Sequence, residues 1–201
     1  MSLMLLLQTS NGVPMLGLAR ADEIVFDSST LPEWDGSRDY RAILEAGLAA
    51  LGADLSDLTE ITVDIGPGGM GVTRTGASFA NALGFALGLP VCAIPAFEML
   101  GAQLATDETP VVIVRKAARP YVHFGLYQNG ELARYEHLTR DEVQNLITSL
   151  HKFNLAGNVS FDGHNAPMRN AADLQTMLTV ARSKPAPAPQ ARVYPIVEVL
   201  T

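Results

Sequence analysis

The segment ITVDIGPGGMGVTRTG, residues 61–76, decides the fold because a strand pattern gives way to a helix pattern across a glycine-rich turn. Residues 61–65 are predicted to form a strand. A helix is expected over residues 73–87, because Gly88 and Pro90 then end it. A strand, a turn and a helix in this order are typical of the crossover that connects parallel strands.

The glycine-rich turn has two interpretations. Backbone amides in such a turn can approach an anion at a helix N-terminus. However, the turn lacks the Gly-Lys-Ser/Thr of a P-loop, and it lacks the acidic residue that follows a dinucleotide-binding turn by about twenty positions. We therefore favour a tight structural turn over a phosphate site. Its residues are Gly66, Pro67, Gly68, Gly69, Gly71 and Arg74.

Strands and helices are predicted on both sides of this segment. The first half is expected to contain strands at residues 3–9, 15–20, 23–28, 61–65 and 91–94 and helices at 38–51, 73–87 and 96–104. A polar, proline-containing stretch at 106–110 marks the start of the second half. There, strands are expected at 111–116, 121–127, 131–137 and 154–157 and helices at 140–150 and 170–181. A Pro-Ala linker at 184–189 precedes a last element at 191–200.

Each half therefore predicts three hairpin-connected strands followed by a helix, a strand and a helix. A mixed sheet that begins as an antiparallel meander and continues through a βαβ crossover satisfies this order. This is the RNase-H-like plan, and two copies of it make the actin-like (ASKHA) architecture. We predict an α/β protein with mixed sheets flanked by helices, in which residues 1–105 form one RNase-H-like domain and residues 106–201 a smaller one.

The composition excludes several classes of function. The net charge is −7 and the pI is about 5.0, so direct nucleic-acid binding is not predicted. The single cysteine, Cys92, excludes internal disulfides and multi-cysteine metal sites, and it suits a cytoplasmic location. The apolar stretch at 79–95 is interrupted by Gly88 and Pro90 before it reaches the roughly 20 residues that a membrane span needs.

Catalytic residues and metal ligands are not predicted. The four histidines, His123, His137, His151 and His164, include no pair within four positions, so each is interpreted as a core or surface residue rather than a ligand. The chain has no Gly-x-Ser-x-Gly elbow. Asp64 either faces a cleft between the domains or accepts hydrogen bonds from the amides of the following turn, and the second interpretation is favoured.

In its context, the glycine-rich turn resembles the Gly-Pro-Gly-Ser-Phe-Thr-Gly-x-Arg-x-Gly signature of the TsaB (YeaZ) family. Gly69 and Met70 stand where that signature has Ser and Phe, and the Thr is missing. The resemblance continues through Gly84-x-Ala86-x-Gly88-Leu89-Pro90-Val91. The matching signature residues are Gly66, Pro67, Gly68, Gly71, Arg74 and Gly76. TsaB is the non-catalytic subunit in the synthesis of threonylcarbamoyladenosine in tRNA, and it is a glycoprotease-like (peptidase M22-like) relative of the catalytic subunit TsaD.

The resemblance implies that the helices at 38–51 and 73–87 form the surface that pairs with TsaD or with a second copy. Both helices carry small residues, which would let helix backbones approach closely. The alternative is that these small residues pack only on the protein's own sheet. The predicted interface residues are Tyr40, Ile43, Gly47, Gly76, Ser78, Ala80, Asn81 and Gly84.

One departure from the family bears on catalysis. Members usually end the first strand with Asp-Thr-Ser, whose acid would face a nucleotide-bound metal, whereas this chain has Gln8-Thr9-Ser10. An amide lacks the charge that holds Mg²⁺ beside phosphates. We therefore expect a non-catalytic scaffold or activator that pairs with a TsaD-like enzyme, is a homodimer alone, has no cofactor of its own and has no peptidase activity. The alternatives are a small enzyme with ATP or ADP and Mg²⁺ in the cleft or at the partner interface, and a paralogue that only self-associates.

Overall fold

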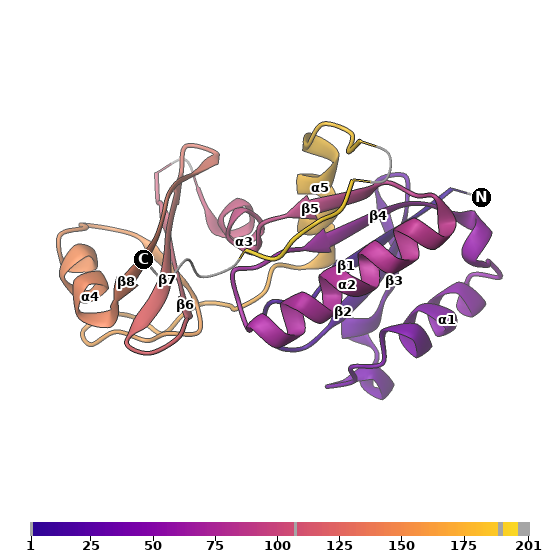
Figure 1. The fold of residues 1–201 in the computed structure, drawn as a ribbon. Helices are drawn as coiled ribbons and strands as arrows, with labels where there is room; N and C mark the ends of the chain where they lie inside the picture. The colour runs from indigo at the N-terminus through magenta and orange to yellow at the C-terminus, as the bar shows by residue number, and fades with distance from the viewer. Residues whose placement is uncertain (1, 107, 189–190, 197–201) are drawn as a thin grey trace.

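The structure, a computed structural model of the chain, describes residues 2–106, 108–188 and 191–196 (Figure 1). Within these ranges the strands form a five-stranded sheet in the order β3-β2-β1-β4-β5. β1 is antiparallel to β2 and parallel to β4, as an RNase-H-like sheet requires. Its strands are β1 (Leu3–Gln8), β2 (Met15–Arg20), β3 (Glu23–Asp27), β4 (Leu58–Asp64) and β5 (Val91–Ile94).

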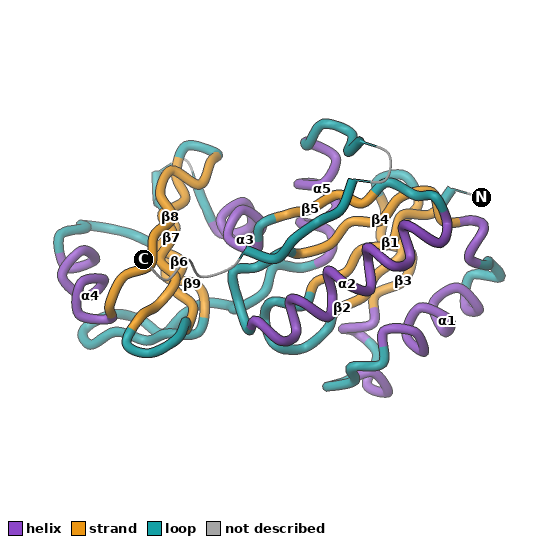
Figure 2. Tube along the Cα trace, viewed as in Figure 1, coloured by secondary structure: helices purple, strands orange, loops and turns teal. Residues whose placement is uncertain are grey.

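A second sheet follows in the chain and repeats the start of this plan. Among the described residues it has four strands, in the order β8-β7-β6-β9. β6 is antiparallel to β7 and parallel to β9 (Figure 2). Its strands are β6 (Val111–Lys116), β7 (Tyr121–Gln128), β8 (Glu131–Thr139) and β9 (Asn154–Gly157). The two mixed sheets confirm the predicted α/β, actin-like fold class.

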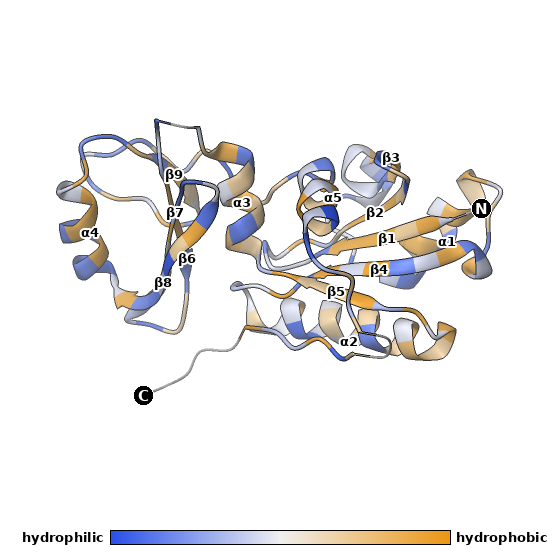
Figure 3. Cartoon of the chain, turned by 90° about the horizontal axis from the view of Figure 1, so that it is seen from above, coloured by the Kyte–Doolittle hydropathy of each residue, from blue (hydrophilic) through white to orange (hydrophobic). Residues whose placement is uncertain are grey.

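Helices cover the sheets on both faces. α1 (Tyr40–Ala50) and α2 (Met70–Leu87) pack on one face of the first sheet, and α5 (Leu174–Ser183) packs on the other (Figure 3). α3 (Ala96–Leu104) lies between the two sheets, and α4 (Arg140–Thr148) packs against the second sheet. Three short 3-10 helices lie in the connections: η1 (Ser28–Thr30), η2 (Pro32–Trp34) and η3 (Leu55–Asp57).

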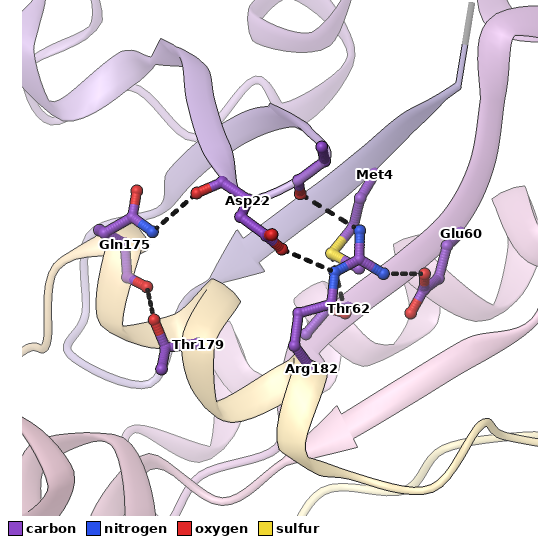
Figure 4. Close-up of polar contacts among 8 residues, drawn as sticks. Met4, Asp22, Glu60, Thr62, Gln175, Thr179 and Arg182 are labelled. Carbon is purple, nitrogen blue, oxygen red and sulfur yellow. Dashed lines mark hydrogen bonds and ion pairs between the residues drawn. The ribbon is translucent and has the colours of Figure 1, made fainter.

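Helix α5 does not lie where the sequence placed it. We expected it to complete the second domain, but it packs on the first sheet and shares a core with α3. Polar contacts hold both ends of the helix there (Figure 4): near its C-terminus Arg182 lies 3.1 Å from the Glu60 carboxylate and 3.9 Å from that of Asp22, and near its N-terminus Gln175 donates to the Asp22 carbonyl. The chain therefore returns to the first sheet after β9. The predicted boundary near residue 105 marks where the chain leaves the first sheet, but it does not assign α5 to the correct sheet.

The C-terminal segment also returns to the first sheet. Residues 191–196 run beside α2 without forming a helix or strand (Figure 1). Asn81 of α2 holds them through two hydrogen bonds with the Val193 backbone, donating to its carbonyl over 2.8 Å and accepting from its N–H over 3.0 Å. The amide of Ile196 donates to the Ile65 carbonyl. The rest of the predicted last element, residues 197–200, lies outside the described residues.

Three apolar clusters stabilise this arrangement. One fills the space between the first sheet and α1 and α2, and another lies between the second sheet and α4. The third joins the two sheets through α3 and α5, and it includes Cys92, Phe97 and Met177. Cys92 is thus a buried core residue, as expected, and burial raises the pKa of its thiol. None of the described helices has the length and apolar composition that crossing a bilayer requires.

A pair of methionine variants tests whether α5 belongs to this shared core. Met177 is buried on α5, whereas Met168 is exposed. We expect Met177→Ala to lower the free energy of unfolding by about 2 to 5 kcal/mol because it leaves a cavity in the core. Met168→Ala should change it by less than about 0.5 kcal/mol. Urea unfolding followed by circular dichroism measures both, and equal effects would contradict the described position of α5.

Candidate functional site

Arg115, the fifth residue of β6, connects the second sheet to the strand ends of the first. Its side chain is 1% exposed and points out of the second sheet into the junction. Its Nη1 donates to Ser10 Oγ over 2.5 Å and to the Pro67 carbonyl over 2.8 Å. Its Nε donates to Asn170 Oδ1 over 3.1 Å, and its Nη2 donates to the carbonyl of the same residue. One guanidinium thus joins the β1–β2 turn, the glycine-rich turn and the segment that returns to α5.

Asp64, the last residue of β4, supplies the opposite charge at this junction. Its Oδ2 accepts hydrogen bonds from the amides of Thr9 and Ser10 over 3.3 and 2.9 Å, and its Oδ1 accepts one from Gly66 over 2.7 Å. The carboxylate is fully buried. It therefore organises the two turns, as the favoured interpretation of Asp64 expected, and three backbone amides already use both of its oxygens.

The junction has a defined electrostatic balance. Burial lowers the pKa of Arg115 to about 10, while the nearby Asp64 carboxylate acts to raise it. The guanidinium is therefore still charged at neutral pH. Ser10 connects the two groups, since its amide donates to Asp64 and its hydroxyl accepts from Arg115. A buried cation whose three nitrogens all donate, together with a buried anion whose two oxygens both accept, favours one relative position of the two sheets.

The glycine-rich turn is shaped by close backbone contacts within the chain. Gly66 has a φ of +91°, which favours glycine. A Cβ on Gly68 would lie 2.1 Å from the Ser10 carbonyl oxygen, so the turn packs directly on the β1–β2 turn. Pro67 is buried and accepts from Arg115. These contacts support the interpretation as a structural turn, whereas Gly69, Gly71 and Arg74 lie exposed at the start of α2.

The residues at the end of β1 do not fit a nucleotide-bound Mg²⁺ ion. Gln8 is buried and its Nε2 donates to the Ala172 carbonyl over 3.0 Å, so the amide binds the returning segment. Within the described part of the chain, Gln8 Oε1 and Thr9 Oγ1 have no hydrogen-bond partner, but both are neutral donors to a metal. The carboxylate of Asp64 is already used, and the Arg115 cation would repel a second cation.

The predicted interface residues divide into buried and exposed groups. Gly76, Ala80 and Gly84 form a ridge of small residues along α2. Ala80 is 0% exposed, and a Cβ on Gly76 or Gly84 would collide with Thr9 or Val91, so this ridge packs on the protein's own sheet. Our prediction that the ridge contacts a partner was therefore wrong. The buried residues are Tyr40, Ile43, Gly47, Gly76, Ala80 and Gly84, while Ser78 is exposed and Asn81 is half-buried against Val193.

The outward face of α2 is different from this ridge. It combines small residues with Phe85, which is 77% exposed. Beside it, a groove of about 420 Å³ is lined by α2 and by the C-terminal segment, whose Tyr194 is 71% exposed. The exposed residues of this face, called the α2 face below, are Gly71, Arg74, Thr75, Ser78, Ala82, Phe85 and Ala86.

The family model that matches this chain is "TsaD: tRNA N6-adenosine threonylcarbamoyltransferase", and it matches residues 37–186. The chain belongs to the TsaD family. YeaZ from Pseudomonas aeruginosa has the same fold as this TsaD-family chain, with a TM-score of 0.69 and 20% identity over 98% of this chain and 100% of that one. A second structure, "an uncharacterized protein with similarity to peptidase YEAZ" from the same organism, gives a TM-score of 0.69 and 21% identity over 98% and 99% of the chains. The resemblance to TsaB (YeaZ) is thereby confirmed.

Two curated relatives of this TsaD-family chain come from mycobacteria. An "uncharacterized protein" of Mycobacterium tuberculosis and one of Mycobacterium bovis are each 33% identical to it over 85 residues. These matches cover 42% of this chain and 39% of the relatives, so less than half of their length is represented.

Sequence patterns alone did not identify Arg115 as part of this site. It was not among the site residues that these patterns predicted. Its position could have indicated it. Arg115 directly follows the apolar run Val111–Val114, and a charged residue that continues a buried strand is itself buried only when it has partners.

A substitution of Arg115 tests the junction. Arg115→Met keeps the length of the side chain but leaves Asp64 as a buried anion without its cation, so we expect a loss of about 3 to 5 kcal/mol in the free energy of unfolding. Arg74→Met removes the same charge from an exposed position and should change it by less than about 0.5 kcal/mol. Chemical denaturation of both variants decides: an unchanged Arg115→Met protein would show that the junction does not stabilise the fold.

Proposed function

We propose that this chain is a non-catalytic subunit that pairs with a TsaD-like enzyme in threonylcarbamoyl modification of the adenosine beside the tRNA anticodon. Its family membership and its YeaZ fold support a role in this modification. The observation that carries the non-catalytic part is the junction, because Arg115, Gln8 and Asp64 fill the strand ends where a catalytic relative would hold nucleotide and metal.

The α2 face is the surface that we assign to the partner. Among its described residues Arg74 is the charged side chain, and the centres of protein interfaces are depleted in charge. Phe85 is a large exposed aromatic side chain, a type that is enriched at the centres of protein interfaces. Ser78 and Ala82 precede it by about two turns and one turn of helix, so a partner helix could approach the backbone closely beside this anchor.

The partner would provide what this chain lacks. The net charge of −7 disfavours binding to the phosphate backbone of tRNA, so the RNA is expected to bind the enzyme and not this subunit. Binding through the α2 face would favour the active conformation of the enzyme by the difference in affinity between its two states. Alone, the same face would pair with a second copy, and both events would take place in the cytoplasm.

Co-purification with the TsaD-like protein of the same organism tests this function. Wild type should form a stable complex, whereas Ser78→Arg and Phe85→Asp should weaken it at least tenfold, because each places a charge in an apolar contact. Asn145→Arg on α4 adds a charge to an exposed helix position of the second sheet and should bind like wild type.

Two results would contradict the proposal. If wild type shows no association with the enzyme and no effect on its activity, the chain is not this subunit. If Asn145→Arg is as damaging as Phe85→Asp, or neither α2 variant has an effect, the partner binds elsewhere. Circular dichroism of each variant establishes that the fold is intact before binding is compared.

A further inference from the structure

The hairpin of β7 and β8 brings together two histidines that are fourteen positions apart in the sequence. Asn129 and Gly130 form its turn, with φ values of +53° and +81°. The register then shifts between Leu126 and Tyr127, and Ala133 has no partner across the ladder. This bulge places His137 directly opposite His123. Without the extra residue, His137 would lie on the opposite face of the sheet.

Three potential donor atoms converge at this point. His123 Nδ1 lies 2.6 Å from His137 Nε2, and it lies 2.9 Å from the hydroxyl oxygen of Tyr135. The Tyr135 hydroxyl is 3.4 Å from His137 Nε2. Each atom is therefore within 3.4 Å of the other two. Two nitrogens and one oxygen that share such a small volume form one face of a coordination polyhedron.

The surroundings hold these side chains in place. His123 is 2% exposed, and its ring stacks on that of Tyr135. Phe97 of α3 contacts the Tyr135 ring edge-on from the first sheet's side of the junction. His137 is half-buried and Tyr135 is partly exposed, so an ion could reach the donors from the β8 side. A buried ligand supported by packed neighbours loses little conformational entropy when it binds a metal.

We propose that His123, His137 and Tyr135 form a site for a divalent transition-metal ion of the zinc type. Two ligand atoms on a tetrahedral zinc ion lie about 3.3 Å apart. The two histidine nitrogens, now 2.6 Å apart, would have to separate by about 0.7 Å, while the Tyr135 oxygen already lies 2.9 and 3.4 Å from them. A water molecule or an anion would complete the coordination. Imidazole nitrogen is the ligand type that zinc, copper and nickel prefer, while the absence of a carboxylate from this set excludes a site built for Mg²⁺ or Ca²⁺.

Arg115 lies beside this site, but its charged group points toward the first sheet, which reduces its repulsion of a bound cation. Arg115 is the cross-strand partner of His123 on β6, so it is the nearest cation from that strand. Its guanidinium is directed toward Ser10 and Pro67 at the strand ends of the first sheet and toward Asn170 of the returning segment, and the Phe97 ring contacts both Arg115 and Tyr135. Glu136 and Arg134 of β8 form an ion pair with each other, and Arg134 lies over the ring of Phe124. Neither belongs to the cluster of His123, His137 and Tyr135.

Metal binding by the purified full-length chain without a polyhistidine tag tests the proposal. Zn²⁺ is titrated by calorimetry, and Co²⁺ is used as a spectroscopic probe of tetrahedral coordination. Wild type should bind one ion per chain, and His137→Gln should weaken binding at least tenfold. His151→Gln removes an exposed histidine elsewhere in the second lobe and should bind like wild type.

Tyr135→Phe provides a second variant that keeps the ring against Phe97. We expect it to weaken Zn²⁺ binding and to change the visible spectrum of bound Co²⁺, because one oxygen ligand is replaced. The midpoint temperature of thermal unfolding should rise with Zn²⁺ concentration in wild type but not in His137→Gln. The proposal is overturned if wild type binds no ion at a one-to-one ratio, or if His137→Gln and His151→Gln bind as wild type does.

Discussion

The buried guanidinium of Arg115 is the interaction on which the arrangement of the two sheets depends. A charge at this depth is unfavourable unless it is well hydrogen-bonded, and its partners come from three separate segments: Ser10, Pro67 and Asn170. These partners are in place only when both turns of the first sheet are formed and the chain has returned from β9. The Asp64 carboxylate fixes the same turns from the other side through their amides.

This constraint also bears on the proposed non-catalytic function. At the strand ends of the first sheet, where the sequence left open a nucleotide cleft, the side chains of Gln8, Asp64 and Arg115 form hydrogen bonds within the chain itself. Gln8 binds the returning segment at Ala172 and does not present a carboxylate to a metal. The surface that we assign to a partner protein is the α2 face with its exposed Phe85. The proposed function follows from this division between a filled junction and an unpaired helix face.

Local patterns predicted the elements well because each depends on nearby residues. The strands at 15–20, 91–94, 111–116 and 154–157 have the predicted bounds, and their order was enough for the fold class. Long-range placement could not be predicted in the same way. The small residues of α2 were compatible with a partner or with the protein's own sheet, and only the packing of Gly76, Ala80 and Gly84 in the structure decides between them. The pairing of His123 with His137 depends on one bulged residue, which no periodicity reveals.

The central claim is that the chain's own side chains replace nucleotide and metal at the junction of the two sheets. Calorimetric titration of the isolated chain with ATP in the presence of Mg²⁺ tests it most directly. The account predicts no saturable binding by wild type, because Arg115 and Asp64 are already hydrogen-bonded within the chain. Stoichiometric binding of Mg²⁺-ATP by wild type, lost when Gln8 or Asp64 is substituted, would contradict it and would restore the hypothesis of a nucleotide-dependent enzyme.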